Sequence, residues 1–167
     1  MSVRYGTSFK GGCMKRILDA CCGSRMFWFD KTNPDVVFMD CREHDEILTN
    51  GQHLVVKPDV FGDFRNMDFE DNSFHLVVFD PPHLMVKENS WLFKKYGGLN
   101  KETWKDDLKR GFSECFRVLK PNGILIFKWA ESNIPLKEVL QCTDQEPLFG
   151  HKTKKGGTTI WVAFMKN

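Results

Sequence analysis

The sequence predicts an α/β fold in which a mostly parallel central sheet is covered by helices on both faces. Short apolar, β-rich runs recur along the chain and alternate with segments able to hold helices. The length of 167 residues is typical of one domain, so we expect a single domain over residues 1–167. The expected strands cover residues 16–21, 35–40, 53–60, 75–80, 123–129 and 158–165.

The clearest helix is expected over residues 101–119, where apolar residues recur every three or four positions. It should stop at the Lys-Pro-Asn-Gly turn of residues 120–123. The strand 158–165 is expected to run antiparallel, at or beside an edge of the sheet. Residues 84–100 form a long connection that breaks the alternation. Long connections inside compact domains are usually functional or disordered, and we expect this loop to face the substrate.

The composition excludes several classes of protein. A formal net charge of +2 and a hydrophobic content of 41% are ordinary values that neither demand nor exclude a nucleic-acid partner. No apolar run approaches ~18 residues and no secretory signal is visible, so we expect a cytoplasmic protein without a membrane partner. No Cys-x-x-Cys pair occurs, which predicts reduced thiols and no metal site. The cysteines are Cys13, Cys21, Cys22, Cys41, Cys115 and Cys142.

A strand that runs into small residues stands near the N-terminus. The apolar residues Ile17 and Leu18 precede the segment 19–24, Asp-Ala-Cys-Cys-Gly-Ser. Small residues let a ligand approach the backbone closely, and the start of a helix offers amides to anionic groups. An ordinary strand-to-helix turn can have the same residues, so this motif alone leaves both interpretations open. The Gly-x-Gly-x-x-Gly fingerprint of dinucleotide sites is absent.

Acidic residues follow the next two expected strands. Asp40 ends the second strand, about 20 residues past the first motif, where a carboxylate can accept hydrogen bonds from both hydroxyls of a ribose. Asp63 follows the third strand and can accept from an adenine amino group, with Phe61 and Phe64 beside the ring. The alternatives are a solvated acid for Asp40, a turn-forming acid for Asp63 and core packing for the aromatic residues.

The tetrapeptide Asp80-Pro81-Pro82-His83 follows the apolar run 76–79. A buried parallel strand is thus expected to end at an acid, at the edge where open α/β sheets bind their ligands. The prolines fix the backbone and lack N–H donors. Asp80 and a proline carbonyl can therefore accept the two hydrogens of a planar amino group, with His83 stacked on the ring. The alternative is an acid that caps a proline turn.

Lysine-rich segments lie in two places. Residues 152–157, Lys-Thr-Lys-Lys-Gly-Gly, are expected to form a basic hairpin, and further lysines lie within residues 87–110. Together these segments can form a rim that contacts phosphates. Charge runs of this kind are more often only solvated, so both interpretations stay open.

In order and spacing, these motifs resemble those of class I S-adenosylmethionine-dependent methyltransferases over nearly the whole chain. Residues 19–24 resemble the family's first motif, with Ala20 in place of proline and Arg25 in place of the last glycine. Residues 116–123 resemble its signature at the helix end and fifth strand. Residues 80–83 resemble the (Asp/Asn/Ser)-Pro-Pro-aromatic motif of enzymes that methylate planar amino nitrogens.

The resemblance implies a Rossmann-like domain that uses S-adenosyl-L-methionine and no metal. It implies methyl transfer to an amino nitrogen, with adenine N6 in DNA or RNA favoured. The implied catalytic residues are Asp80, Pro81, Pro82 and His83. The implied cofactor-binding residues are Asp19, Ala20, Cys21, Gly23, Asp40, Asp63 and Phe64.

Other functions remain open. The methyl acceptor can instead be a small metabolite, because residues 69–74 and 119–123 also resemble metabolite methyltransferases, or a protein side chain. A different class of function is an inactive cofactor-fold module that binds RNA or a protein. No large target-recognition domain is visible. Recognition of a nucleic acid would therefore depend on residues 84–100, the basic hairpin or a protein partner.

Overall fold

The computed structural model describes residues 15–167, in which seven strands form one sheet and two form a separate hairpin. The strands of the sheet are β1 (Ile17–Asp19), β2 (Val36–Asp40), β5 (Val60–Phe61), β6 (Phe74–Phe79), β7 (Leu119–Ala130), β8 (Phe149–Lys152) and β9 (Thr159–Met165). The hairpin consists of β3 (His44–Ile47) and β4 (His53–Val56). The helices are α1 (Trp91–Tyr96), α2 (Trp104–Val118), α3 (Leu136–Val139) and the 3₁₀ helix η1 (Leu140–Cys142).

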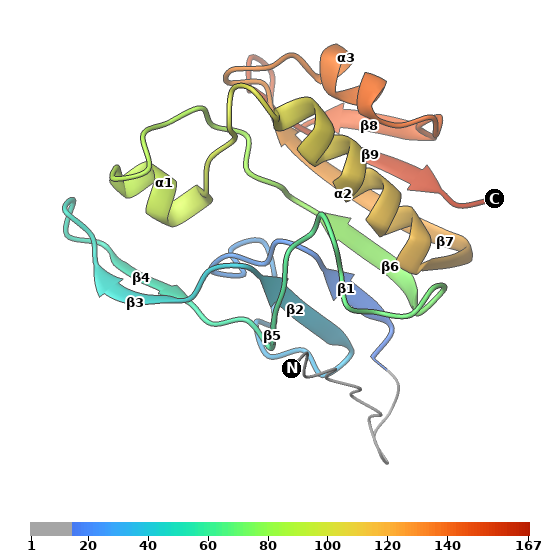
Figure 1. The fold of residues 1–167 in the computed structure, drawn as a ribbon, viewed down its shortest axis with the longest axis horizontal. Coiled ribbons are helices and arrows are strands. Elements are labelled where there is room, and N and C mark those ends of the chain that lie inside the picture. Colours follow the sequence, from blue (N-terminus) through green and yellow to red (C-terminus); the bar gives the residue numbers. More distant parts are fainter. Residues whose placement is uncertain (1–14) are drawn as a thin grey trace.

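The strand order in the main sheet is β5-β2-β1-β6-β7-β9-β8. The first five of these strands are parallel, while β9 runs antiparallel to both of its neighbours. The predicted fold, a mostly parallel sheet with an antiparallel C-terminal strand beside its edge, is therefore confirmed. Because the first five strands are parallel, their carboxyl ends lie along one edge, next to α1 and the β3–β4 hairpin (Figure 1).

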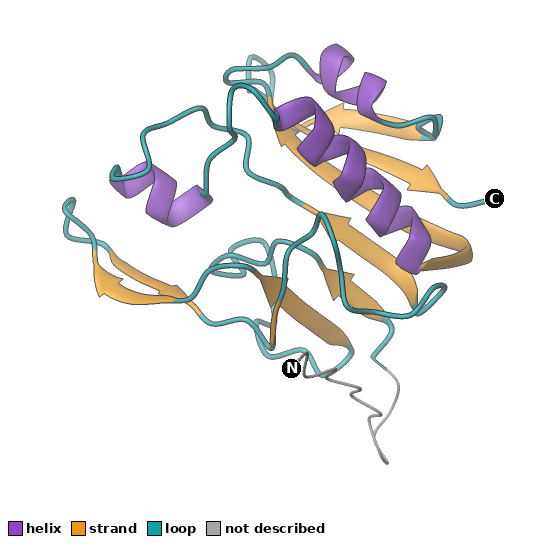
Figure 2. Ribbon diagram, in the orientation of Figure 1, coloured by secondary structure: helices purple, strands orange, loops and turns teal. Residues whose placement is uncertain are grey.

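One face of the sheet packs against α2, which lies along β7 (Figure 2). The helix covers most of the predicted range 101–119 and turns a stripe of apolar residues toward the sheet. Phe112 on this stripe has its ring centroid 4.9 Å from that of Phe127 on β7 and 5.5 Å from that of Phe79 on β6. All three rings are almost fully buried. Burying a side chain of this size stabilises the fold by about 1.5–3 kcal/mol.

The second face differs from the expectation of helices on both faces. Within residues 15–167, α2 and η1 contact each other on the first face, and residues 20–35 form turns where a helix was expected. Asp30 and Asn33 accept hydrogen bonds from N–H groups two residues further on, a geometry that competes with a helix. This segment still covers β2, because the ring of Trp28 packs on that of Phe38 at 5.3 Å.

The expected strand 53–60 is two separate strands. Residues His53–Val56 are β4 of the hairpin, and Val60–Phe61 are β5 at the edge of the main sheet. Pro58 lies between them and has no N–H to donate to a continuous ladder. The prediction of one strand was therefore wrong here, and the chain turns a corner at this proline.

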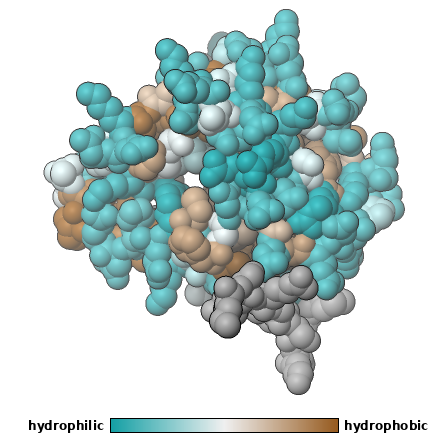
Figure 3. All heavy atoms as spheres, in the orientation of Figure 1, coloured by the Kyte–Doolittle hydropathy of each residue, from teal (hydrophilic) through white to brown (hydrophobic). Residues whose placement is uncertain are grey.

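The surface on the α2 side is mostly hydrophilic, with scattered hydrophobic patches (Figure 3). None of the helices in residues 15–167 has the length and apolar character needed to cross a membrane. The five cysteines of this part of the chain are free thiols, as expected, while Cys13 lies outside the described residues.

Candidate functional site

Acidic residues gather at the carboxyl edge of the parallel strands. β1 ends at Asp19, β2 ends at Asp40, and Asp80 directly follows β6. Asp63 stands two residues beyond β5. Because β2, β1 and β6 are neighbours in the sheet, three of these carboxyl groups lie side by side. The structure thus brings together acids that are far apart in the sequence.

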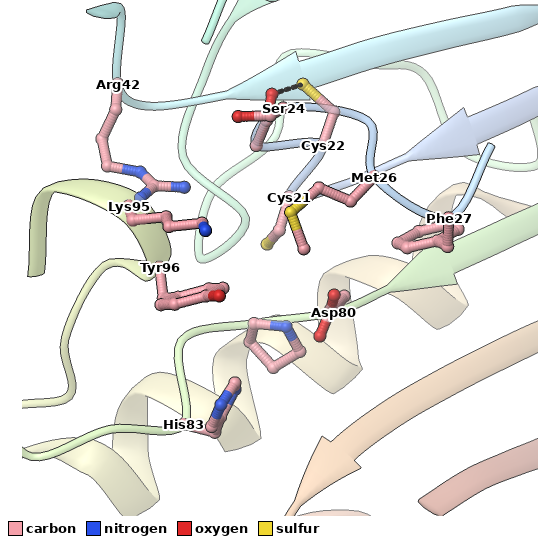
Figure 4. A pocket seen from close by; sticks show the side chains of 12 residues that line it. Cys21, Cys22, Ser24, Met26, Phe27, Arg42, Asp80, His83, Lys95 and Tyr96 are labelled. Carbon is pink, nitrogen blue, oxygen red and sulfur yellow. Dashed lines mark hydrogen bonds between the residues drawn. The ribbon is translucent and has the colours of Figure 1, made fainter. Parts of the chain in front are cut away.

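A pocket opens between this edge and α1 (Figure 4). One wall comes from the segment after β1, the first motif of the sequence. A second wall comes from the tetrapeptide after β6, and a third from α1 and the residues after β2. The lining residues are Cys21, Cys22, Gly23, Ser24, Met26, Phe27, Asp80, Pro81, His83, Arg42, Lys95 and Tyr96. The two motifs that carry the resemblance therefore face the same cavity.

Asp19 is fully buried beneath the first wall. Its carboxyl group accepts a hydrogen bond from Nε1 of Trp28 at 2.7 Å and one from the N–H of Cys21 at 3.3 Å. Burial raises the pKa of Asp19 to about 7, although both hydrogen bonds favour the charged form. The neighbouring N–H of Ala20 donates to Val78 of β6 at 2.9 Å. These contacts fix the course of the segment that reaches Gly23, where φ is +47°.

Asp40 is 3% exposed and lies behind the same segment. It accepts hydrogen bonds from the N–H of Gly23, from the N–H of Arg42 and from Nε and Nη2 of Arg42, all between 2.9 and 3.0 Å. A carboxylate offers about four acceptor positions, so these four bonds saturate it. Ribose hydroxyls can bind Asp40 only if the Arg42 side chain gives up its bonds.

Asp63 is similarly paired with the arginine two residues further on. Nε and Nη2 of Arg65 donate to both of its oxygens, the shortest distance being 2.6 Å, and this bonding lowers the pKa of Asp63. The ring of Phe64 packs toward the core, 5.3 Å from that of Phe79. Phe61, in contrast, is 70% exposed beside Asp63. Of the two aromatic residues, Phe61 is the more exposed, since Phe64 is half-buried.

Asp80 faces the pocket and pairs with a lysine from the adjacent strand. Nζ of Lys128 on β7 donates to Oδ2 of Asp80 at 2.5 Å. The Asp80 side chain is 18% exposed, and burial raises its pKa against the attraction of Lys128. The site therefore holds a carboxyl group whose charge depends on one close cation.

The tetrapeptide is fixed by its neighbours. Pro81 is buried, and Gly97 lies against Pro82 so closely that an added Cβ would be 2.8 Å from Pro82 Cγ. The ring centroid of His83 is 6.1 Å from that of Trp129 and 6.4 Å from that of Tyr96. Burial lowers the pKa of His83, which favours the neutral ring needed for stacking.

Residues 84–100 are docked on the β3–β4 hairpin. Lys94 of α1 donates to Glu46 at 2.6 Å, and Lys95 donates to Gln52 at 3.0 Å. Nη1 of Arg42 donates to the carbonyl of Lys94 at 3.2 Å. The segment predicted to face the substrate thus contributes a helix to the pocket wall, and Arg42 links that helix to Asp40.

Sequence reasoning missed Arg42 and Lys128. A signal existed for Lys128, because it is the one charged residue inside the apolar run 124–130. Arg42 had a weaker signal in its position two residues after Asp40, repeated by Arg65 after Asp63. The spacing suggests a local ion pair, but the bond to α1 depends on the tertiary structure.

No protein-family model matches the chain, and no curated protein sequence matches it. Solved structures are similar to it. A S-adenosylmethionine-dependent methyltransferase from Methanosarcina mazei gives a TM-score of 0.51 at 13% identity, over 92% of this chain and 94% of its own. One from Leishmania major gives 0.54 at 15% identity, over 95% and 67%. A candidate rRNA methylase from Clostridium thermocellum gives 0.52 at 13% identity, over 92% and 89%. This chain therefore has the fold of S-adenosylmethionine-dependent methyltransferases.

Proposed function

We propose that the protein transfers a methyl group from S-adenosyl-L-methionine to an amino nitrogen, with the exocyclic N6 of adenine in DNA or RNA as the favoured acceptor. The observation that carries this proposal is the shared pocket. It places Asp80, Pro81 and His83 opposite Gly23 and the first motif, at the edge where open α/β sheets bind ligands. The similar structures from methyltransferases, one of them a candidate rRNA methylase, support it.

The residues present fit the cofactor. Gly23 has a positive φ and no neighbouring atom closer than 3.9 Å to an added Cβ, so a ligand can approach the backbone here. Asp40 lies directly behind Gly23, and its carboxylate can accept hydrogen bonds from the ribose hydroxyls once the Arg42 side chain releases it. Asp63 and the exposed ring of Phe61 lie further along the edge for the adenine.

When bound, the cofactor would supply an electrophilic methyl carbon. The nitrogen lone pair would form the new bond as the carbon–sulfur bond breaks, the sulfur would leave as a neutral thioether, and the proton lost from nitrogen would pass to solvent. An aromatic amino group is a weak nucleophile because its lone pair is delocalised into the ring. Asp80 and a carbonyl of Pro81 or Pro82 accept its two hydrogens and turn the lone pair out of the ring plane. The Asp80 carboxylate also stabilises the positive charge that develops on nitrogen.

His83 provides the stacking surface for the base, between Tyr96 and Trp129. A base in a duplex must flip out to reach this pocket, at a cost of a few kcal/mol, whereas a single-stranded base need not. The basic hairpin joins β8 to β9, and the pairing of Ala130 with Thr159 places it at the carboxyl edge of β7. Lys154 and Lys155 there are exposed and suited to contact phosphates, with a protein partner as a further source of recognition.

The test is transfer of labelled methyl from the cofactor to separate pools of DNA, RNA, protein and small metabolites. Asp80→Ala should abolish the transfer while cofactor affinity stays within about twofold, because Asp80 contacts the acceptor. Asp144→Ala, an exposed acid in the loop after η1, is the matched control and should keep full activity.

Each result has a defined meaning. Label in a nucleic-acid pool that depends on Asp80 supports the proposal, and digestion then identifies the base. Label only in metabolites or protein would replace the proposed acceptor with one of those classes. Cofactor affinity that falls together with activity in Asp80→Ala would place Asp80 in the cofactor site. No cofactor binding at all would favour an inactive binding module.

A further inference from the structure

Lys128 and Asp80 are brought together by the register of two adjacent strands. β6 and β7 are parallel, and Phe79 is the partner of Phe127. The residues that come next are therefore Asp80, directly after β6, and Lys128 on β7. Both side chains point away from the α2 face, because Phe79 and Phe127 point toward it. The sheet itself thus determines this contact.

Two aromatic rings hold the lysine in place. Nζ of Lys128 lies 5.5 Å from the ring centroid of Phe27 and 5.7 Å from that of Trp161. The two rings contact each other edge to face at 5.4 Å. Aromatic faces attract an ammonium group but accept no strong hydrogen bond. Asp80 is therefore the strong acceptor available to Lys128 within residues 15–167.

The two oxygens of Asp80 have different surroundings. Oδ2 accepts from Lys128, and no hydrogen bond to Oδ1 exists within residues 15–167. In the same part of the chain every fully buried side-chain oxygen has a hydrogen-bond partner. Oδ1 is therefore accessible, and the pocket is the space that Asp80 lines. One oxygen is bound to the lysine and the other is open to a ligand.

We propose that Lys128 is the positioning residue of this site: its ammonium group keeps Asp80 ionised and turns the free oxygen toward the amino group of the acceptor. The inference rests on the proposed function. A protonated carboxyl group would present a donor where the amino group also presents donors, so the acceptor would not be oriented. Lys128 acts through Asp80 and does not contact the reacting atoms.

Other charged or titratable groups also face Asp80. His83 follows on the same connection, and Arg42 lies after β2; Arg42, and His83 when protonated, favour the ionised form of Asp80. Asp19 on β1 and Cys21 after it stand on the other side, and their negative forms oppose it. Of the cations, only Lys128 makes a hydrogen bond to Asp80 within residues 15–167. Its removal should therefore have a larger effect than loss of the more distant charges.

The first experiment measures Asp80 directly and needs no activity. Aspartate is labelled with ¹³C at the side-chain carboxyl carbon, Asp80→Asn identifies the Asp80 resonance, and the chemical shift is followed from pH 4 to pH 9. In Lys128→Met the Asp80 midpoint should rise by about 1–3 pH units, the range that one close opposite charge produces. Lys128→Arg should restore the original midpoint. Lys137→Met, an exposed lysine on α3, should leave it unchanged.

Lys128→Gln covers the case in which Lys128→Met does not fold. Glutamine retains a hydrogen-bond donor but no charge, so the Asp80 midpoint should rise in this variant too. A folded Lys128→Met or Lys128→Gln with an unchanged midpoint would overturn the proposal.

The second experiment links the titration to turnover. In Lys128→Met the acidic limb of the pH profile of kcat/KM should move upward by the same amount as the Asp80 midpoint, with the KM for S-adenosylmethionine unchanged. A uniform loss of kcat with an unmoved acidic limb would show a merely structural role and refute the inference. If the wild-type protein methylates no pool while the titration behaves as expected, the proposed function fails and the control of Asp80 by Lys128 stands.

Discussion

Substitution of Asp19 by asparagine should remove a pH dependence from the stability of the protein. Asp19 is fully buried, and burial raises its pKa to about 7 from an ordinary value of 3.8. The carboxyl group accepts from Trp28 Nε1 on Oδ2 at 2.7 Å and from the N–H of Cys21 on Oδ1 at 3.3 Å, and the single side-chain oxygen of an asparagine can accept the first of these bonds. The substitution therefore removes the titration and keeps the shorter of the two hydrogen bonds; loss of the other adds an offset that does not depend on pH.

The direction in which stability changes with pH follows from proton binding. Between pH 4 and pH 7 the folded protein holds a proton on Asp19 that the unfolded chain has already released, so the free energy of unfolding falls as the pH rises. The pKa difference of about 3 units corresponds to about 4 kcal/mol, at 1.36 kcal/mol per unit. This contribution is fully present below pH 3.8 and lost above pH 7. As the pH rises from 4 to 8, the free energy of unfolding of the asparagine variant should therefore increase by about 4 kcal/mol relative to that of the wild-type protein.

The assay is urea denaturation of both proteins at each pH, since urea carries no charge and gives the free energy of unfolding by linear extrapolation. The difference between the two proteins cancels the contributions of all other titrating groups. Asp144→Asn, an exposed acid, should show a constant difference over the same range. A constant difference for Asp19→Asn would show that Asp19 stays ionised, and would refute the argument from burial.

Two further substitutions test the pairing and packing around the site by urea denaturation at pH 7. Arg42→Met should reduce the free energy of unfolding by about 3 kcal/mol, because it leaves the buried charge of Asp40 without its cation; a loss below about 1 kcal/mol would contradict this. Gly111→Ala should destabilise by about 1–3 kcal/mol, since its Cβ would lie 2.6 Å from Phe79 Cζ. The cost of overpacking must here exceed the gain of about 1 kcal/mol that alanine brings over glycine in a helix. The control is Ser113→Ala at an exposed position of the same helix, which should stabilise the protein slightly. A Gly111→Ala variant more stable than the wild-type protein would show that the aromatic rings move aside at little cost.

The main sheet could be predicted because its inner strands are buried on both faces and so appear as continuous apolar runs. β2, with five buried residues, and the last three residues of β6, Val77–Phe79, are of this kind. β3 could not be predicted in the same way, since His44–Ile47 is polar and forms a strand only through pairing with β4. β5 has only two residues in the sheet, too few for any periodic signal. Both of these strands form because they pair with a neighbouring strand, and their local sequence pattern does not predict them.

The missing helix after β1 has a different cause. Met26, Phe27, Trp28 and Phe29 are consecutive, so they cannot all lie on one face of a helix. As turns, the segment places Trp28 on the sheet and Phe27 against Lys128. The segment thus lacks regular helical hydrogen bonds. Its aromatic residues Phe27 and Trp28 instead cover the sheet and contact Lys128 beside the candidate site.

Strand-end acids could be predicted from the sequence, but their partners could not. A carboxylate at the end of a strand is a local feature, whereas the contact of Lys128 with Asp80 depends on a register between residues 48 positions apart. This difference bears on function. Asp19, Asp40 and Asp80 repel one another when ionised, and the nearby negative charges already contribute to the raised pKa of Asp19. Arg42 and Lys128 offset that repulsion, which lets Asp40 and Asp80 lie close to Asp19, whose own pKa burial raises to about 7. A ligand with a sulfonium charge would enter an edge where Arg42 must release Asp40, and the positive charge of the ligand would compensate for the loss of that cation.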